Sequence, residues 1–214
     1  MDIVLIYDDN YKKWAEITEQ SILKHNPDVK LHRIQSVSDE FIKEFIGIDN
    51  NLHPNNICYA KLFIQDLFPE LDKVLYLDTD LIVLDDLTTL YNMSFDDNYI
   101  VGCESHDYGK RQALELGIDK YLNSGVMLLD LKAMRENKVS DYVRANFKPL
   151  LDKVSLWIYD ETIINGLLHD KTKFISEEWN YCANREYKGR EVQEPKILHF
   201  IGADKSGMLE WQEQ

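Results

Sequence analysis

Short apolar runs that end at polar residues recur along the chain and predict strands. The first, Ile3 to Tyr7, is too short for a helix and ends at Asp8-Asp9-Asn10. A continuous apolar run of this length is typical of a strand buried on both faces, as in a parallel sheet. Similar runs predict further strands over 29–34, 73–77, 81–84, 99–103, 125–129 and 197–200.

Apolar residues at helical spacing separate several of these runs. Trp14, Ile17 and Ile22 follow this spacing until Asn26-Pro27 ends it. Other stretches predict helices over 39–46, 59–68, 132–147 and 160–168. The alternation indicates an α/β fold with a mostly parallel central sheet flanked by helices. No repeat or linker interrupts it, so we expect a single domain over residues 1–214, which is the catalytic domain if the chain is an enzyme.

The amino-acid composition limits the kinds of partner and the cellular compartment that we expect for this protein. The chain has 24 Lys and Arg against 38 Asp and Glu, a formal net charge of -14, which disfavours nucleic acid and anionic membranes as partners. Its three cysteines are far apart and odd in number, so they indicate neither a disulfide framework nor a cysteine zinc site. No basic leader or membrane-length apolar stretch is present, so we expect a soluble, cytoplasmic protein without a membrane anchor.

The acidic triplet Asp78-Thr79-Asp80 is the main candidate for chemistry. In a regular strand, residues two apart point to the same face, so Asp78 and Asp80 would converge on one ligand while Thr79 turns away. Hard oxygen ligands suit Mg²⁺, Mn²⁺ or Ca²⁺, and such a metal commonly keeps open positions for substrate phosphates. Asp8 and His199 also follow apolar strands, at the strand ends where open α/β sheets bind ligands.

Other interpretations of the triplet remain open at this point. Asp-x-Asp is common in solvated turns, although apolar residues on both sides argue against a solvated turn here. An EF-hand is excluded because Ile82 and Val83 stand where a third oxygen ligand and a glycine are needed. Aspartate-nucleophile phosphatases also place Asp-x-Asp after an apolar strand. In those enzymes that strand is the first of the catalytic domain, whereas in this chain a strand-helix-strand unit comes before the strand that ends at Asp78.

Six segments together resemble, in order, the family-8 retaining glycosyltransferases, the group that contains glycogenin and the bacterial lipooligosaccharide galactosyltransferases. The resemblance implies a GT-A type nucleotide-diphospho-sugar transferase fold. It also implies transfer of a hexosyl or deoxyhexosyl unit from a UDP-sugar to a sugar or glycan hydroxyl, with retention of configuration. The segments are 3–11, 59–62, 73–80, 123–129, 160–165 and 199–205.

The resemblance also implies roles for individual residues. His199 would be the third metal ligand beside Asp78 and Asp80, and its imidazole favours Mn²⁺ over Mg²⁺, which stays possible. Asp160 would stabilise an oxocarbenium-like centre, with Glu161 and Lys205 as further catalytic residues. The residues expected to bind the UDP-sugar are Tyr7, Asp8, Asn10, Tyr11, Lys61, Asp78, Thr79, Asp80, Glu104, Asn123, Gly202 and Lys205.

Several features keep alternatives open. Asp8-Asp9-Asn10 is also a plausible polar turn before a helix, and Asp160 a plausible helix N-cap. Glu161 stands where relatives commonly have an amide, and Ser206-Gly207 replaces their Pro-Trp. A basic, aromatic tail is absent, so either the acceptor is soluble or the chain is a piece of a longer polypeptide. A non-catalytic sugar-nucleotide-binding module would keep Asp8, Asp78 and His199 but tolerate loss of Asp160.

Overall fold

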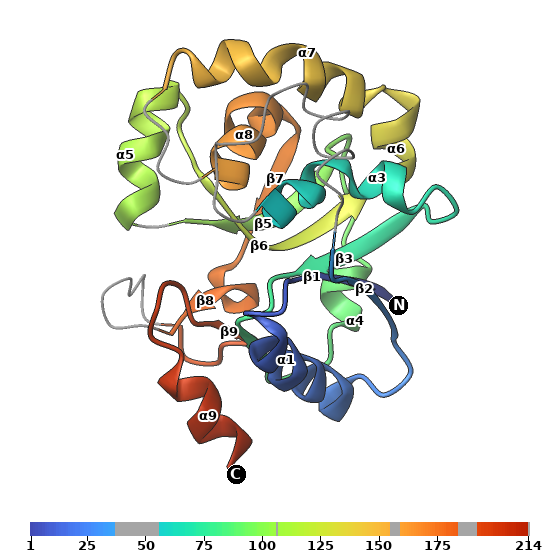
Figure 1. The fold of residues 1–214 in the computed structure, drawn as a ribbon, viewed down its shortest axis with the longest axis vertical. Helices are drawn as coiled ribbons and strands as arrows, with labels where there is room; N and C mark the ends of the chain where they lie inside the picture. Colours follow the sequence, from blue (N-terminus) through green and yellow to red (C-terminus); the bar gives the residue numbers. More distant parts are fainter. Residues whose placement is uncertain (37–55, 106, 155–158, 184–191, 214) are drawn as a thin grey trace.

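Two sheets organise the chain in the computed structural model, which describes residues 1–36, 56–105, 107–154, 159–183 and 192–213. The larger sheet has the strand order β2-β1-β3-β6-β5-β7, and the smaller has the order β4-β9-β8 (Figure 1). The larger sheet comprises β1 (Asp2–Ile6), β2 (Lys30–Ile34), β3 (Lys73–Leu77), β5 (Ile100–Glu104), β6 (Leu122–Asp130) and β7 (Thr172–Ile175). The smaller comprises β4 (Leu81–Val83), β8 (Tyr181–Cys182) and β9 (Ile197–His199).

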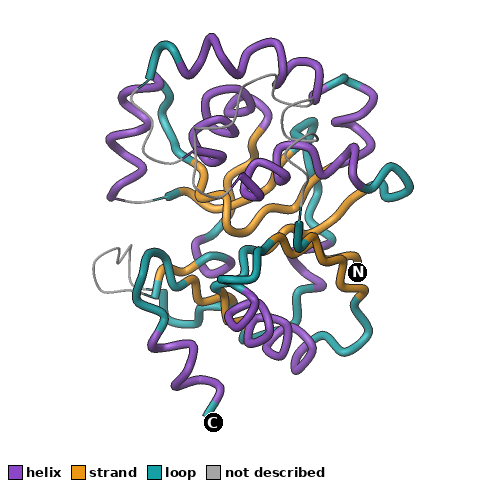
Figure 2. The backbone as a smooth tube through the Cα atoms, viewed as in Figure 1, coloured by secondary structure: helices purple, strands orange, loops and turns teal. Residues whose placement is uncertain are grey.

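Helices cover both faces of the larger sheet. One layer is built from η1, α3, α6, α7 and α8, while α1, α4 and the smaller sheet lie on the opposite side (Figures 1 and 2). The α-helices are α1 (Lys12–His25), α3 (Ile64–Leu67), α4 (Thr88–Tyr91), α5 (Asp107–Leu116), α6 (Leu131–Glu136), α7 (Val139–Leu151), α8 (Tyr159–Leu168) and α9 (Ser206–Gln212). The 3₁₀ helices are η1 (Asn56–Phe63), η2 (His169–Lys171) and η3 (Glu177–Trp179).

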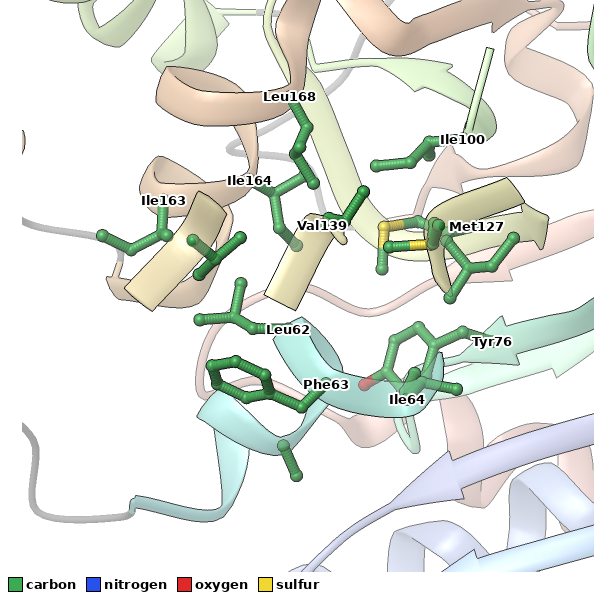
Figure 3. Packing of buried hydrophobic residues seen from close by; sticks show 14 of the residues in the cluster. Leu62, Phe63, Ile64, Tyr76, Ile100, Met127, Val139, Ile163, Ile164 and Leu168 are labelled. Carbon is green, nitrogen blue, oxygen red and sulfur yellow. The ribbon is translucent and has the colours of Figure 1, made fainter. Parts of the chain in front are cut away.

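The two layers explain why the strands are apolar throughout. Successive side chains of a strand point to opposite faces, and each face of this sheet has its own core. In β3, Val74 and Tyr76 pack with α8 and η1, while Leu75 and Leu77 pack on the other side. Figure 3 shows the first of these cores, where Tyr76 and Met127 of the sheet meet Phe63 and Ile164 of the helices. The continuous apolar runs therefore predicted this arrangement correctly.

Strand direction in the larger sheet is mostly parallel, as expected, with one reversal. β1 runs parallel to β2 and β3, and β5 runs parallel to β7, whereas β6 is antiparallel to both of its neighbours. Because β6 is reversed, its first residues lie at the same edge of the sheet as the last residues of β1 and β3. The residues from Leu122 onward therefore border the edge where Asp8 and Asp78 follow their strands.

The α/β class is confirmed, but some elements differ from the prediction. The helix expected over 132–147 is two helices, α6 and α7, because Lys138 between them adopts a left-handed backbone conformation with φ of 53°. The segment expected as a helix over 59–68 is mostly the 3₁₀ helix η1. β7 is only partly buried and lacks a long apolar run, so it was not predicted. The helix expected over 39–46 lies outside the described residues.

Candidate functional site

The Asp78-Thr79-Asp80 triplet lies where the chain leaves the larger sheet and enters the smaller one. The Asp78 N–H donates to the carbonyl of Gly125 at 2.8 Å, and the Asp80 carbonyl accepts from the N–H of Phe200 at 3.0 Å. One aspartate is thus held by each sheet. The two carboxylates do converge, as expected. The expected backbone is wrong, because the triplet forms a bend between β3 and β4 and not a regular strand.

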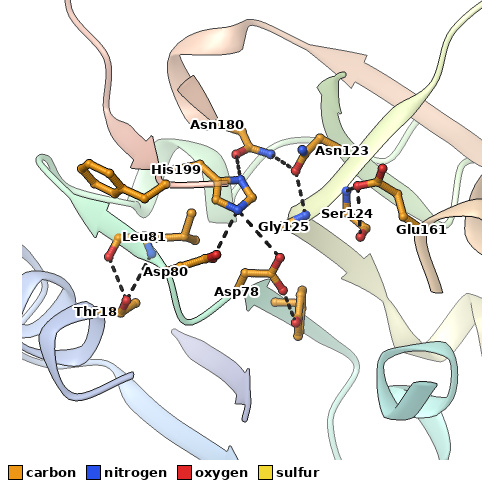
Figure 4. A network of polar contacts seen from close by, with 12 residues as sticks. Thr18, Asp78, Asp80, Leu81, Asn123, Ser124, Gly125, Glu161, Asn180 and His199 are labelled. Atoms are coloured by element: carbon orange, nitrogen blue, oxygen red, sulfur yellow. Dashed lines mark hydrogen bonds and ion pairs between the residues drawn. The ribbon is translucent and has the colours of Figure 1, made fainter. Parts of the chain in front are cut away.

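Asp78, Asp80 and His199 form a compact cluster at this bend. One ligand atom from each lies within 4.8 Å of the others. The His199 Nε2 atom is 3.2 Å from Asp80 Oδ1 and 3.9 Å from Asp78 Oδ2, as drawn in Figure 4. His199 is buried, whereas the side chain of Asp78 is 27% exposed. Two carboxylates and an imidazole nitrogen that converge from three directions fit a divalent ion such as Mn²⁺.

Two buried lysines flank the cluster. Lys205 Nζ lies 2.6 Å from Asp80 Oδ2 and also donates to the carbonyl of Phe200. Although burial opposes ionisation of Asp80, its contacts with His199 and with the Lys205 ammonium group hold its pKa below the usual range. Lys205, which was expected to contact the diphosphate and assist catalysis, is thus within reach of a metal ligand.

Lys61 joins the cluster to helix α8. Its Nζ atom is 2.8 Å from Asp160 Oδ2 and 3.1 Å from Asp78 Oδ1. Burial disfavours the ammonium ion, but the carboxylates of Asp160 and Asp78 outweigh this and raise the pKa of Lys61 well above its ordinary value. Lys61 is therefore a buried, permanently charged ammonium group that links the metal-ligand cluster to the carboxylate predicted to act in catalysis.

The first turn of α8 presents two acidic side chains to the same region. Asp160 lies inside the helix, which begins at Tyr159, so it is not the N-cap residue. The Glu161 Oε2 atom accepts a hydrogen bond of 2.9 Å from the Ser124 N–H, which ties α8 to the first residues of β6 (Figure 4). Both acids line one of the two cavities that lie beside the cluster.

Two cavities open on either side of the cluster and share Lys61, Asp78 and Asp80. One, of about 230 Å³, is lined by Ile6, Tyr7, Asp8, Tyr11, Ile57, Cys58, Lys61, Tyr76, Asp78, Thr79 and Asp80. We call it the β1 cavity. The other, of about 350 Å³, is lined by Lys61, Asp78, Asp80, Gln112, Asn123, Ser124, Asp160, Glu161, His199, Ile201 and Gly202. We call it the α8 cavity.

Most predicted residues line these cavities, but three do not. Asn10 is exposed and donates its side-chain amide to Asp8 at 3.1 Å. Asp8 also accepts from the backbone N–H groups of Asn10 and Tyr11, so this segment is a polar turn as well as part of the cavity wall. The helix cap expected with this turn is wrong, because the N-cap residue of α1 is Tyr11 and its side chain makes no capping hydrogen bond. Glu104, at the end of β5, and Lys205 are absent from the lining of both cavities.

The sequence prediction missed several polar residues at the site. Ser124 lay in a segment used for the family resemblance, but no role was assigned to it. Gln112 comes from α5, which was not predicted, and its buried Oε1 atom has no hydrogen-bond partner among the described residues. Asn180, between η3 and β8, contacts His199 and Asn123. Neither spacing nor composition distinguishes Gln112 or Asn180 from other polar residues.

Two glycosyltransferases are among the solved structures that superpose on this chain. The chain superposes on the galactosyltransferase LgtC in complex with donor and acceptor sugar analogs with a TM-score of 0.82, 22% identity, and coverage of 100% of this chain and 94% of that one. The apo form of glycosyltransferase GlyE from Streptococcus pneumoniae gives a TM-score of 0.74 and 23% identity, and the match covers 100% of this chain and 60% of that one. The GT-A type fold is therefore confirmed.

Curated sequences agree with the fold. Glycosyltransferase GlyE of Streptococcus pneumoniae is 27% identical over 95% of this chain and 56% of its own length. A lipopolysaccharide 1,2-glucosyltransferase of Escherichia coli is 28% identical over 94% of this chain and 61% of its own length. The chain thus spans less than two thirds of these relatives. Among the described residues, the structure contains no helix of the length and apolar character that a membrane span requires.

A family model provides the assignment. The model described as glycosyl transferase family 8 matches residues 50–206, which is well over half of the chain. This range includes both aspartates of the triplet, His199 and the two acids of α8. The chain therefore belongs to glycosyl transferase family 8.

Proposed function

We propose that the protein is a metal-dependent glycosyltransferase that moves a hexosyl or deoxyhexosyl unit from a UDP-sugar to a hydroxyl group of a sugar or glycan, with retention of configuration. The observation that carries this proposal is the cluster of Asp78, Asp80 and His199 between two cavities. A diphosphate at the cluster would have its nucleoside in one cavity and its sugar in the other. The names of relatives, a galactosyltransferase and a 1,2-glucosyltransferase, support a hexosyl donor.

The β1 cavity suits the nucleoside. Tyr7 and Tyr11 offer aromatic surface, and Asp8 offers a carboxylate that accepts the N3–H of uracil. Asp8 is held in place by the N–H groups of Asn10 and Tyr11, at 3.0 and 3.1 Å, which keeps its carboxylate oriented. Neutral cytosine and adenine have no ring N–H to donate to this carboxylate, so we expect preference for uridine over cytidine and adenosine.

Positive charge at the diphosphate has to come from local groups, because a net charge of -14 repels the donor. A bound divalent ion, for which Mn²⁺ fits the ligands best, would neutralise the charge that develops on UDP as the glycosidic bond breaks. Asp78, Asp80 and His199 would hold this ion. Lys61 and Lys205, both buried within ion-pair distance of these aspartates, add two fixed positive charges.

The transfer itself breaks the bond between the anomeric carbon and the diphosphate oxygen. It forms a bond from the same carbon to the acceptor oxygen, on the face that UDP leaves, and the acceptor proton passes to the departing diphosphate. Asp160, on the wall of the α8 cavity, would stabilise the positive charge at the anomeric carbon. Lys61 holds the Asp160 carboxylate at 2.8 Å and so fixes its direction. Glu161 lines the same cavity with one oxygen bound to Ser124.

The decisive experiment is to assay hydrolysis and transfer with UDP-glucose, UDP-galactose, UDP-N-acetylhexosamines and UDP-rhamnose, each with Mn²⁺, Mg²⁺ or a chelator. We expect turnover with at least one donor, its loss with chelator, and a fall of about 100-fold or more in Asp78→Asn and Asp80→Asn, because metal catalysis contributes several kcal/mol. Asp96→Asn is the matched control, since Asp96 pairs with Lys173 on the surface.

Other outcomes separate the alternatives. Undiminished turnover in both aspartate variants would refute the proposed mechanism. Tight binding of UDP-sugar without turnover by any donor and acceptor would favour a sugar-nucleotide-binding module. Release of phosphate from small phosphoesters with no response to UDP would favour a phosphatase, which the family assignment argues against.

A further inference from the structure

A chain of hydrogen bonds behind the metal-ligand cluster begins at a backbone group. The Gly125 N–H donates to Asn123 Oδ1 at 3.0 Å, and Asn180 Nδ2 donates to the same oxygen at 2.8 Å. Asn180 Oδ1 then lies 2.9 Å from His199 Nδ1 (Figure 4). These residues come from three separate parts of the chain, namely β6, the η3–β8 connection and β9.

The direction of every bond in this chain is determined by its first member. A backbone N–H only donates, so the Asn123 atom that faces Gly125 is the oxygen. The Asn180 atom that faces this oxygen must then be the amide nitrogen, which turns the Asn180 oxygen toward His199. An amide oxygen only accepts, so His199 Nδ1 carries a hydrogen. The lone pair of the neutral ring is therefore on Nε2, the atom that faces Asp78 and Asp80.

We infer that Asn180 is a positioning residue that fixes His199 in the tautomer and ring orientation required of a metal ligand. Ligating histidines commonly donate their second ring N–H to an oxygen that sets the tautomer, and loss of that partner typically costs about 10–100-fold in metal affinity. Here the partner is an amide, and its own orientation is set by Asn123 and Gly125. The inference rests on the proposed function, because it concerns the same metal.

The structure also separates this role from simple packing. Asn180 is only partly buried, and its two amide atoms are both used, one toward His199 and one toward Asn123. Replacing the amide by an apolar group of similar size would leave the His199 Nδ1–H without an acceptor, and the ring could then rotate or change tautomer. Replacing it by a carboxylate would keep an acceptor toward Nδ1.

The test compares Asn180→Leu and Asn180→Asp with the wild type by calorimetric titration of Mn²⁺ in the presence of UDP. We expect Asn180→Leu to weaken Mn²⁺ binding by about 10–100-fold. Asn180→Asp should recover part of this loss, because it keeps an acceptor for His199 Nδ1 although its second oxygen has no hydrogen to donate to Asn123 Oδ1. Asn26→Leu is the control, because Asn26 is a buried asparagine whose side chain hydrogen-bonds backbone groups of Ile22, Asp85 and Leu87, away from the cluster. It should lower the melting temperature and leave Mn²⁺ affinity unchanged.

A second readout needs no metal. In nitrogen-15 spectra of the side chain of His199 without added metal, the wild type and Asn180→Asp should show a protonated Nδ1, whereas Asn180→Leu should lose this single state. Equal Mn²⁺ affinity in the wild type and Asn180→Leu, or an Nδ1 without hydrogen in the wild type, would overturn the role of Asn180 and leave the proposed function standing. A wild type that binds no Mn²⁺ with UDP would instead contradict the proposed function, and the spectra would still decide the tautomer.

Discussion

Gly125 is the residue at which the close packing of the site is most evident. A Cβ atom at this position would lie 2.3 Å from Cε1 and 2.8 Å from Nδ1 of His199. Real Cβ atoms do not approach other atoms so closely, so the imidazole ring lies against β6 only because residue 125 has no side chain. The requirement for glycine here is steric contact with His199, the proposed metal ligand, not an unusual backbone angle.

Gly125→Ala should therefore displace the ring of His199. We expect Mn²⁺ affinity in the presence of UDP to fall at least about tenfold, as for other changes that misplace a metal ligand, together with a loss of transferase activity. Electron paramagnetic resonance of free Mn²⁺ measures the affinity directly.

Gly102→Ala in β5 is the control for this prediction. A Cβ atom there would lie 2.6 Å from a methyl group of Leu122, so it strains the same sheet without touching a ligand. It should lower stability and preserve Mn²⁺ binding. If both variants bind Mn²⁺ like the wild type, the contact between Gly125 and His199 does not position the ligand.

At the level of residues, the sequence indicated the proposed metal ligands but not the groups that orient them. Asp78 and Asp80 stood out because two carboxylates interrupted apolar sequence, and His199 through its place in a family pattern. Asn180 and Gln112 carried no such signal, because single amides are common on protein surfaces. Their roles depend on contacts with Asn123, His199 and the α8 cavity, which only the folded chain creates.

Side chains of helix α1 hydrogen-bond the backbone along the outer edge of strand β4. In β4, Leu81 lies opposite His199, and its own N–H and carbonyl point away from β9 toward α1. The hydroxyl of Thr18 donates to the Leu81 carbonyl at 2.8 Å and accepts from its N–H at 3.2 Å. Ser21, one turn later, accepts from the N–H of Val83 at 2.9 Å. The helix thus covers an edge strand that would otherwise expose unpaired backbone groups.

Thr18→Val should consequently destabilise the protein although it preserves shape. Valine leaves the buried N–H and carbonyl of Leu81 without partners, at about 1–3 kcal/mol each, so we expect the free energy of unfolding to fall by about 2–4 kcal/mol. Denaturation in urea measures the change. Thr89→Val, at an exposed position of α4, should change it by less than about 0.5 kcal/mol. Equal effects of the two substitutions would show that α1 does not seal this edge.

Among the elements, those with strong apolar runs could be predicted and those defined by packing could not. β1 and β3 are buried on both faces, so their sequences are apolar without interruption. The break between α6 and α7 has no glycine or proline to mark it, because the residue with the left-handed backbone conformation there is a lysine, Lys138. β7 has an intermediate burial throughout, and its alternation is correspondingly weak.

At the scale of the whole molecule, the site lies at the junction of the two sheets. Asp78 is held by β6 of the larger sheet, Asp80 lies at the corner that leads into β4, and His199 ends β9, the central strand of the smaller sheet. A ligand bound at this junction would contact residues of elements from β1 to β9. Ligands that bind only the folded state stabilise it in proportion to their concentration relative to the dissociation constant.

Mn²⁺ with UDP should therefore raise the melting temperature. At a UDP concentration 100 times its dissociation constant, and with saturating Mn²⁺, the gain is about 2.7 kcal/mol. For a protein of this size that corresponds to roughly 5–10 °C. Differential scanning fluorimetry should show most of this shift lost with a chelator and in Asp80→Asn. An equal shift for UDP with and without chelator would contradict a metal between protein and diphosphate.

Sequence by itself determined the α/β class and the buried strands, and it indicated the three side chains that we propose as metal ligands. It could do so because burial on both faces requires continuous apolar sequence, against which polar residues at strand ends stand out. The tertiary structure alone decided that the triplet is a corner between two sheets, that Lys61 bridges Asp78 and Asp160, and that Asn180 faces His199. Each of these facts depends on distances between residues far apart in the chain, which local patterns of apolar and polar residues do not encode.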